Sequence, residues 1–258
     1  RNLRREYEGV VAVEDVSFSV PHGAILGLIG PNGAGKSTLI DALTGIVKQS
    51  GGSVSLDGRR IDGLGAQRRA RAGIGRSFQS LELFEDVTVA ENLVTAGDRR
   101  DVRAYLSDLV RPGRAQLSPA AVAAVREFEL EDDLGRLPGE LSAGRRRLVA
   151  IARAVSAQPS VLFLDEPAAG LDAHETRELG RLIRRLASER GIAVVLVEHD
   201  VPLVFGICDR VVVLDAGRVI ASGPAAEVRA DPAVVAAYLG TAPASAPAVA
   251  AANGEATA

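Results

Sequence analysis

Residues 30–38 read GPNGAGKST, and this stretch constrains the fold more than any other part of the chain. It matches the phosphate-loop template of Gly, four residues, Gly, Lys and then Ser or Thr, with Gly30, Gly35, Lys36 and Ser37 in the required places. The apolar run AILGLI precedes it at 24–29, and apolar side chains follow at helical spacing, namely Leu39, Ile40, Leu43, Ile46 and Val47. The sequence therefore predicts a strand, a glycine loop and a helix in direct succession.

The residue types of this loop suit the binding of a triphosphate. Glycines let successive backbone N–H groups point inward as an anion-binding nest at a helix N-terminus. Lys36 is predicted to reach the β and γ phosphates, and the Ser37 hydroxyl to ligate Mg²⁺. Lys36 and Lys48 are the only lysines in the chain, so a slim ammonium stands where a guanidinium would not fit. We favour this interpretation over a chance glycine-rich turn because the flanking patterns are those the motif requires.

Composition narrows the class of protein. With 258 residues, the chain is long enough for one domain with a small subdomain, and its 47% hydrophobic and 24% charged residues are typical of globular proteins. A net charge of −3 argues against a nucleic-acid partner. No apolar run approaches the roughly 18 residues of a spanning helix, so we expect other chains to make any membrane crossing. The single cysteine, Cys208, is predicted to be a small buried hydrophobic side chain.

Strand and helix patterns alternate along the chain. Strands are predicted up to residue 20, a hairpin at 53–58, and further strands at 161–164, 192–197, 211–214 and 219–221, with a last helix at 225–239. From about residue 80 to residue 155 the pattern predicts helices, with a helix start at Ser118 and Pro119. These patterns predict an α/β fold of the P-loop type with a mostly parallel sheet and an inserted helical subdomain. Residues 1–240 form the folded domain, and the Ala- and Pro-rich residues 241–258 are expected to be a disordered tail or linker.

The chain contains two arginine-rich stretches. Residues 68–71 read RRAR and are predicted to form a solvated face. The arginines at 145–147 follow the helix start LSAGR, in a first turn where the helix dipole penalises each cation by roughly 0.3–1 kcal/mol. We interpret this conflict as a sign that an outside anion compensates the charge. The alternative is that the three side chains reach away into solvent.

Acidic residues and one histidine follow buried strands. Asp165 and Glu166 end the strand VLFL, and His199 follows the strand predicted at 192–197. Ligands of open α/β sheets bind at the carboxyl ends of parallel strands, so we expect all three residues at one crevice. Beside a phosphate loop, Asp165 would hold magnesium and Glu166 would orient or deprotonate a water. A structural role for His199 is the alternative, because lone histidines are more often structural.

The order of these motifs resembles the ATP-binding subunits of ABC transporters over nearly all of residues 1–240. GPNGAGKST resembles their Walker A motif, Gln79 their Q-loop, LSAGR at 141–145 their signature motif, VLFLDEP their Walker B motif, AAGLD their D-loop and His199 their switch histidine. Tyr7 stands where the family places an adenine-stacking aromatic. The most frequent family signature is LSGGQ, from which Ala143 and Arg145 depart, whereas Ser142 and Gly144 are intact.

The resemblance implies an ABC ATPase fold with an N-terminal antiparallel β subdomain, and ATP and Mg²⁺ as cofactors. It assigns nucleotide binding to Tyr7, Asn32, Gly33, Gly35, Lys36, Ser37, Thr38, Ser142 and Gly144. It assigns the metal to Ser37, Gln79 and Asp165, and catalysis to Glu166, His199 and Gln79. Ser142 and Gly144 would act on the nucleotide of a second ATPase subunit, identical or paralogous, in a dimer with one site on each side.

Within the family, three stretches resemble the ATPases of branched-chain amino acid importers: RSFQSLELFEDVTVAENL, LFLDEPAAGLD and CDRVVVLDAGRVIASGPAAEVRADPAVVAAYLG. This implies a peripheral subunit at the cytoplasmic face of the plasma (inner) membrane, partnered by transmembrane permeases and indirectly by a periplasmic or extracellular solute-binding protein. Leu81, Leu83 and Phe84 would contact the permease, or else belong to the subdomain core.

Three other functions are weaker interpretations. Importers of urea or short amides have similar ATPases. A soluble ABC ATPase of translation or DNA repair is disfavoured, because the chain has one motif set and neither heptads nor cysteine pairs. A binding module that does not hydrolyse ATP is disfavoured because Lys36, Asp165, Glu166 and His199 are all present.

Overall fold

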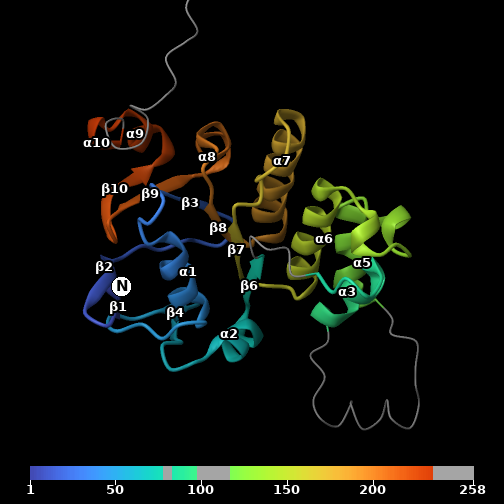
Figure 1. Ribbon diagram of the computed structural model, residues 1–258, viewed down its shortest axis with the longest axis horizontal. Helices are drawn as coiled ribbons and strands as arrows, with labels where there is room; N and C mark the ends of the chain where they lie inside the picture. The colour runs from blue at the N-terminus through green and yellow to red at the C-terminus, as the bar shows by residue number, and fades with distance from the viewer. Residues whose placement is uncertain (78–82, 98–116, 235–258) are drawn as a thin grey trace, which may run out of the picture.

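A central sheet of six strands organises the computed structural model, which describes residues 1–77, 83–97 and 117–234 (Figure 1). In spatial order the strands are β10 (Arg218–Pro224), β9 (Arg210–Asp215), β3 (Ile25–Ile29), β8 (Ala193–Val197), β7 (Val161–Asp165) and β6 (Ile74–Ser77). All neighbouring pairs are parallel except β10 with β9. The predicted mostly parallel sheet is therefore confirmed, and the carboxyl ends of β3, β7 and β8 share one edge.

The helices surround this sheet (Figure 1). They are α1 (Lys36–Thr44), α2 (Ala66–Ala72), α3 (Val89–Gly97), α5 (Pro119–Glu127), α6 (Ala143–Ser156), α7 (Ala173–Arg190), α8 (Val201–Ile207), α9 (Ala225–Ala230) and α10 (Pro232–Val234), with 3-10 turns at Glu131–Asp133 and Pro138–Glu140. Side-chain caps begin several of them. The predicted helix start at Ser118 is confirmed, because its hydroxyl accepts a hydrogen bond of 3.1 Å from the Ala121 backbone N–H.

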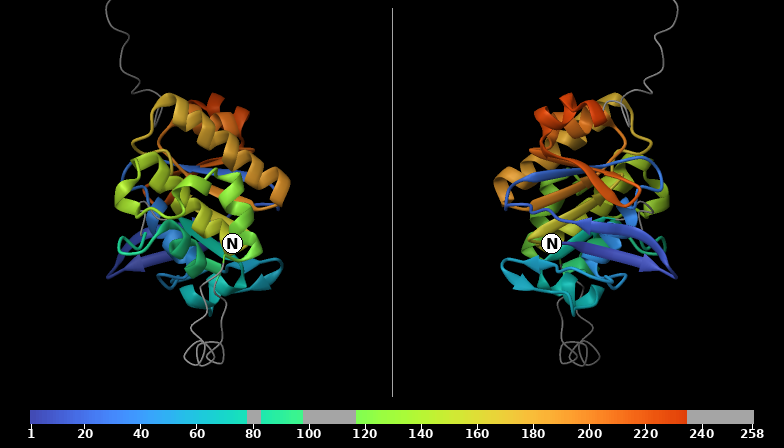
Figure 2. Two further views of the ribbon diagram at one scale, coloured as in Figure 1. Left: turned by 90° about the vertical axis from the view of Figure 1, so that its right-hand side faces the viewer. Right: turned by 90° about the vertical axis from the view of Figure 1, so that its left-hand side faces the viewer.

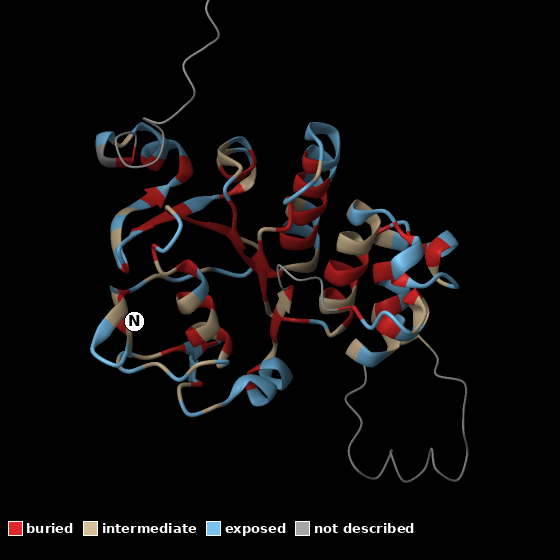
Figure 3. Cartoon of the chain, in the orientation of Figure 1, coloured by how far each residue is buried: buried red, intermediate tan, exposed pale blue. Residues whose placement is uncertain are grey.

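Two hydrophobic cores cover the two faces of the sheet, as the alternation along β3 illustrates. Ile25 and Ile29 belong to the core that contains the apolar stripes of α6, α7 and α8. Leu26 and Leu28 belong to the other core, which includes Leu39 and Ile40 of α1. Successive side chains of a strand point to opposite faces, so an unbroken apolar strand is buried on both sides. Figure 3 shows the resulting layer of buried residues along the sheet.

An antiparallel pair, β1 (Leu3–Tyr7) and β2 (Val10–Val16), packs over α1 on one side of the molecule. The helices α3, α5 and α6 form a separate group on the other side; Figure 2 shows this group facing the viewer on the left and the antiparallel pair on the right. The predicted hairpin is confirmed as β4 (Ser55–Leu56) and β5 (Arg59–Arg60), joined by Asp57 and Gly58 with φ of 50° and 77°. No helix within the described ranges is both long and apolar enough to cross a membrane.

Several local predictions were wrong. The first strand pattern ends at Val16, and Phe18 packs against the core from an irregular segment. The spacing of Val122, Val125 and Phe128 predicts one apolar stripe along α5, but Val122 is exposed, and the buried residues of this helix are Ala121, Ala124 and Val125. The last predicted helix is interrupted at Asp231, because Pro232 lacks the N–H that a continuous helix needs. Its continuation to residue 239 lies outside the described residues, as does the tail at 241–258.

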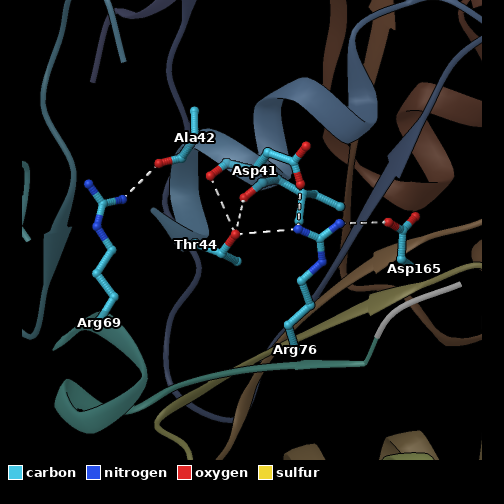
Figure 4. A network of polar contacts seen from close by, with 7 residues as sticks. Asp41, Ala42, Thr44, Arg69, Arg76 and Asp165 are labelled. Carbon is cyan, nitrogen blue, oxygen red and sulfur yellow. Dashed lines mark hydrogen bonds and ion pairs between the residues drawn. The ribbon is translucent and has the colours of Figure 1, made fainter. Parts of the chain in front are cut away.

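The predicted solvated face at residues 68–71 contains one buried arginine. Arg69 is only 1% exposed, whereas Arg68 and Arg71 are exposed. Its Nη1 donates hydrogen bonds to the carbonyl oxygens of Ala42 at 2.7 Å and Leu43 at 2.8 Å (Figure 4). These carbonyls belong to the last turn of α1, where a helix has no internal donors. Arg69 therefore caps the helix that the phosphate loop begins.

Candidate nucleotide-binding site

The phosphate loop opens onto a cleft of about 450 Å³. Residues 32–38 line it on one side, and Glu166 and His199 line it from the ends of β7 and β8. Strand, loop and helix follow one another as the sequence predicted, with β3 ending at Ile29 and α1 beginning at Lys36. The structure thus brings Asn32, Gly33, Gly35, Lys36, Ser37 and Thr38 together with two of the predicted catalytic residues.

Gly35 shows why this loop needs glycine. Its φ is 96°, in the left-handed region, and an added Cβ would lie 2.5 Å from the carbonyl oxygen of Ala12. Ala12 belongs to β2, so the antiparallel pair closes directly on the loop. The loop backbone is consequently held against a second element just before the first turn of α1, where the free N–H groups lie.

The Lys36 side chain is hydrogen-bonded to the backbone of the phosphate loop. Its Nζ donates hydrogen bonds to the carbonyl oxygens of Gly30 at 2.7 Å and Pro31 at 3.0 Å. The side chain is 7% exposed, and burial lowers its pKa against the opposing influence of the Glu166 and Asp165 carboxylates. A buried ammonium beside the free N–H groups of a helix start is a donor set for phosphate oxygens. The residues present therefore fit a triphosphate.

Asp165 ends β7 beside an arginine that the sequence analysis did not single out. Nη2 of Arg76, on β6, lies 3.2 Å from Oδ2 of Asp165, and its Nη1 lies 2.5 Å from Oδ1 of Asp41 on α1 (Figure 4). Burial raises the pKa of Asp165, although the Arg76 guanidinium opposes this shift. The sequence could have indicated this contact, because a charged residue within an apolar strand requires a partner of opposite charge when the strand is buried.

Glu166 and His199 form the second pair at this edge. Nε2 of His199 lies 3.0 Å from Oε1 of Glu166. Glu166 has a φ of 48°, in the left-handed region that is uncommon for a residue other than glycine and costs backbone strain. Its backbone N–H donates to Val197 O at 2.8 Å, and its carbonyl oxygen accepts a hydrogen bond from Arg147 of α6. The strained residue is therefore fixed from two neighbouring elements.

Glu198 is a second residue that the sequence analysis missed. It is 4% exposed, and its carboxylate accepts hydrogen bonds from the backbone N–H groups of Ala168 at 2.6 Å and His199 at 3.1 Å. Burial raises its pKa, and these hydrogen bonds oppose the shift. Glu198 thus ties the segment after Glu166 to the segment that carries His199. The sequence could have indicated a role for Glu198, because this acid directly precedes the predicted histidine at the end of a core strand.

The predicted signature residues lie elsewhere. Ser142 caps α6 by accepting a hydrogen bond of 3.3 Å from the Arg145 backbone N–H, and with Gly144 it lines a second cavity next to Leu171 and Glu175. Neither residue lines the phosphate cleft of its own chain. The contact of Ser142 and Gly144 with a nucleotide therefore stays a prediction.

The arginines at 145–147 have partners within the chain. Nε of Arg145 donates to Asp133 Oδ2 at 2.7 Å, and Arg146 pairs with Glu85. Arg147 donates to the Glu166 carbonyl and lies near the Glu198 carboxylate, and burial lowers its pKa. The alternative that all three side chains reach away into solvent is wrong, because acceptors from the same chain offset these charges in the first turn of α6. The interpretation that an outside anion also compensates them stays a prediction.

The remaining predicted contacts are Tyr7, Gln79 and the apolar residues that follow Gln79. Tyr7 is 39% exposed and does not line it, and its ring lies 4.0 Å from the guanidinium carbon of Arg5. Gln79 and Leu81 lie outside the described residues. Leu83 belongs to the hydrophobic core, as one of the two interpretations predicted, whereas Phe84 is 55% exposed.

A phosphate loop at a helix start, with an acid pair and a histidine at the same edge of a parallel sheet, defines a P-loop nucleotide-binding domain. The sequence matches the family model described as ABC transporter over residues 13–169, so the chain belongs to the ABC transporter ATP-binding family. These proteins are ATPases that couple hydrolysis to transport. Residues 218–244 match a second model, described as branched-chain amino acid ATP-binding cassette transporter.

Individual relatives agree with this assignment. The chain is 39% identical to the high-affinity branched-chain amino acid transport ATP-binding protein LivG of Salmonella typhimurium, over 93% of this chain and 96% of that protein. It is similar in structure to MJ1267, an ATP-binding cassette of an ABC transporter in its ADP conformation, with a TM-score of 0.80 and 30% identity over 93% and 96% of the two chains. It is also similar to the dimeric bacterial cassette MJ0796, with a TM-score of 0.72 and 25% identity over 87% and 97%.

Proposed function

We propose that this chain is the ATP-hydrolysing subunit of an importer for branched-chain amino acids. The observation that carries the proposal is the position of Glu166 and His199, which face the phosphate loop across one cleft. The names of its relatives, LivG among them, support the choice of solute. Urea and short amides are the alternative solutes.

Different residues would bind the nucleotide and activate the attacking water. Lys36 would exchange its bonds to the Gly30 and Pro31 carbonyls for phosphate oxygens of ATP. Glu166 would orient or deprotonate the attacking water, and His199 would hold Glu166 and contact the γ phosphate. Tyr7 would stack on the adenine.

Magnesium would neutralise the charge that develops on the phosphates. The residues that would hold it are Ser37, Asp165 and Gln79. A hydroxyl, a carboxylate and an amide fit this ion, because magnesium prefers oxygen ligands and takes the others from phosphates and water. Ser37 is the second residue of α1, and Asp165 is the last residue of β7.

A second ATPase subunit would complete each site. Ser142 and Gly144 lie outside the cleft of their own chain, so in a symmetric pair they would close on the nucleotide of the partner. The relative MJ0796 is described as a dimeric cassette, which supports this arrangement. The membrane partners would be permease subunits, and a periplasmic or extracellular solute-binding protein would deliver the solute. The chain would then sit peripherally at the cytoplasmic face of the plasma (inner) membrane.

The hydrolytic assignment is tested by Glu166→Gln. This variant keeps the size of the side chain but removes the base, so we expect ATP binding to persist while turnover falls by a factor on the order of 10² or more. Light scattering after gel filtration with ATP and Mg²⁺ should then show a trapped dimer. Glu189→Gln, on the exposed face of α7, is the matched control and should behave as the parent chain. A Glu166→Gln variant that hydrolysed ATP at the parent rate would contradict the role given to Glu166.

The solute is tested by reconstituting the chain in vesicles with permease subunits and a solute-binding protein, for which the neighbouring coding sequences are to be searched. Labelled leucine or valine should enter when ATP is present on the side of this chain, and the Glu166→Gln subunit should abolish entry. Uptake of labelled urea instead of either amino acid would favour the alternative importer class.

A further inference from the structure

Arg76 joins two carboxylates that come from different elements, α1 and β7. It projects from β6 and pairs with Asp41 at 2.5 Å and with Asp165 at 3.2 Å (Figure 4). Nη1 also lies 3.4 Å from the hydroxyl oxygen of Thr44, one turn further along α1. The Arg76 and Asp165 side chains are 10% and 9% exposed. These charges are therefore largely removed from water.

Such an arrangement restricts where the two carboxylates can lie. A guanidinium is planar and rigid, so its donors determine the direction from which each carboxylate approaches. Buried charges are costly to separate, because a lone buried ion loses its hydration without compensation. The bridge therefore resists any movement of the end of β7 relative to α1.

The two bridged elements are also the ones that carry two predicted magnesium ligands. Ser37 and Asp41 share α1 and are four residues apart, about one helical turn. Asp165 is the last residue of β7. Through Asp41 and Asp165, Arg76 thus connects the segment that carries the Ser37 hydroxyl to the Asp165 carboxylate. It lines no part of the phosphate cleft itself.

We propose that Arg76 is a positioning residue that holds the Asp165 carboxylate, relative to Ser37, in the orientation that magnesium requires. The inference rests on the proposed role of Asp165 as a magnesium ligand. Partners that orient the ligands of a metal change its affinity by about 10- to 100-fold when they are removed. Arg76 would therefore affect metal binding much more than nucleotide binding.

The test measures Mn²⁺ in place of Mg²⁺, because Mn²⁺ binding can be followed by its electron paramagnetic resonance signal. The ATP-loaded full chain is titrated with Mn²⁺, and ATP affinity is measured separately in EDTA. For Arg76→Gln we expect Mn²⁺ affinity to fall by about 10- to 100-fold, with ATP affinity in EDTA unchanged. Arg76→Lys should recover only part of the loss, because one ammonium lacks the fork that spans both carboxylates.

Three further variants make the result specific. Arg60→Gln removes a surface arginine whose Nε lies 2.8 Å from Asp62, and it should leave Mn²⁺ affinity at the parent value. Asp41→Asn weakens only the α1 end of the bridge and should reduce Mn²⁺ affinity less than Arg76→Gln does. It also carries the test if circular dichroism shows that Arg76→Gln does not fold. Asp165→Asn removes the charge of the proposed ligand and shows whether Asp165 takes part in Mn²⁺ binding.

The outcomes separate this inference from the proposed function. If Asp165→Asn weakens Mn²⁺ binding but Arg76→Gln and Asp41→Asn leave it unchanged or make it tighter, Arg76 does not position the ligand and the inference is overturned. An equal loss of ATP affinity in EDTA would also overturn it, because the bridge would then be a general support of the cleft. If Asp165→Asn itself has no effect, the magnesium assignment in the proposed function fails instead.

Discussion

Nε2 of His199 lies 3.0 Å from Oε1 of Glu166, although 33 residues separate the two in the chain. The contact exists because β7 and β8 are neighbours in the parallel sheet and both end at the phosphate loop. Glu198, buried beside His199, fixes the same region by accepting a hydrogen bond from Ala168. The pair is thus held by backbone as well as by side chains.

His199→Ala should remove the partner of Glu166 without altering the phosphate loop. We expect kcat for ATP hydrolysis to fall by about 10²- to 10⁴-fold, the range of a positioned proton-transfer group, while ATP affinity stays close to the parent value. Steady-state hydrolysis and equilibrium ATP binding check this. The control is His22→Ala. His22 lies in the turn before β3, whereas the phosphate loop follows the other end of β3. Equal losses in the two variants would argue against a special role for His199.

Gly35→Ala should both destabilise the protein and abolish ATP binding. Its Cβ would enter the van der Waals radius of the Ala12 carbonyl oxygen, and the left-handed backbone adds about 1–2 kcal/mol for a residue with a Cβ. The matched control is Gly139→Ala, because nothing lies within 4 Å of its added Cβ and its φ is not positive. Urea unfolding and ATP titration compare the two variants, and similar stabilities would contradict the role of close packing against β2.

Arg69→Ala should lower the stability of the folded protein strongly, and Arg68→Ala should leave it nearly unchanged. The buried guanidinium of Arg69 serves the terminal carbonyls of α1, so its loss leaves buried acceptors without donors. We expect the free energy of unfolding to fall by about 3 kcal/mol or more for Arg69→Ala, and by less than about 0.5 kcal/mol for the exposed Arg68. Urea denaturation measures both. A small effect at Arg69 would mean that water replaces its hydrogen bonds.

Cys208 should make stability depend on pH in the alkaline range. Burial raises the pKa of this thiol from 9.0 to about 12. The folded chain therefore holds the proton more tightly than the unfolded chain, so this contribution is fully present below pH 9 and is lost as the pH rises toward 12. Between these values the loss is about 1.4 kcal/mol per pH unit.

Cys208→Ala isolates that contribution, because the variant has no thiol to titrate. The stability difference between the parent chain and this variant, measured in urea at a series of pH values, should shrink above pH 9. A difference that stays constant up to pH 11 would show that the thiol ionises as easily in the folded protein as in the unfolded one.

Local patterns predicted the phosphate loop and several of the elements around it. Apolar runs located β3, β7 and β8, helical spacing located α1, and the glycines, Lys36 and Ser37 located the phosphate loop, because each depends on residues close together in the chain. The acids at 165–166 and His199 could be placed at one edge, because parallel strands end on the same side of a sheet.

The partners of the charged residues depend on folding. The bridge from Asp41 through Arg76 to Asp165 joins residues up to 124 positions apart in numbering, from three elements, and no spacing in the chain indicates it. Arg69 and Arg68 are neighbours of the same type, yet packing against α1 buries one and leaves the other in water. Hydrophobic periodicity indicates which face of an element is buried. The ionic partner of a charged residue depends instead on the distances between charges across the sheet, and these distances are set only when the elements pack together.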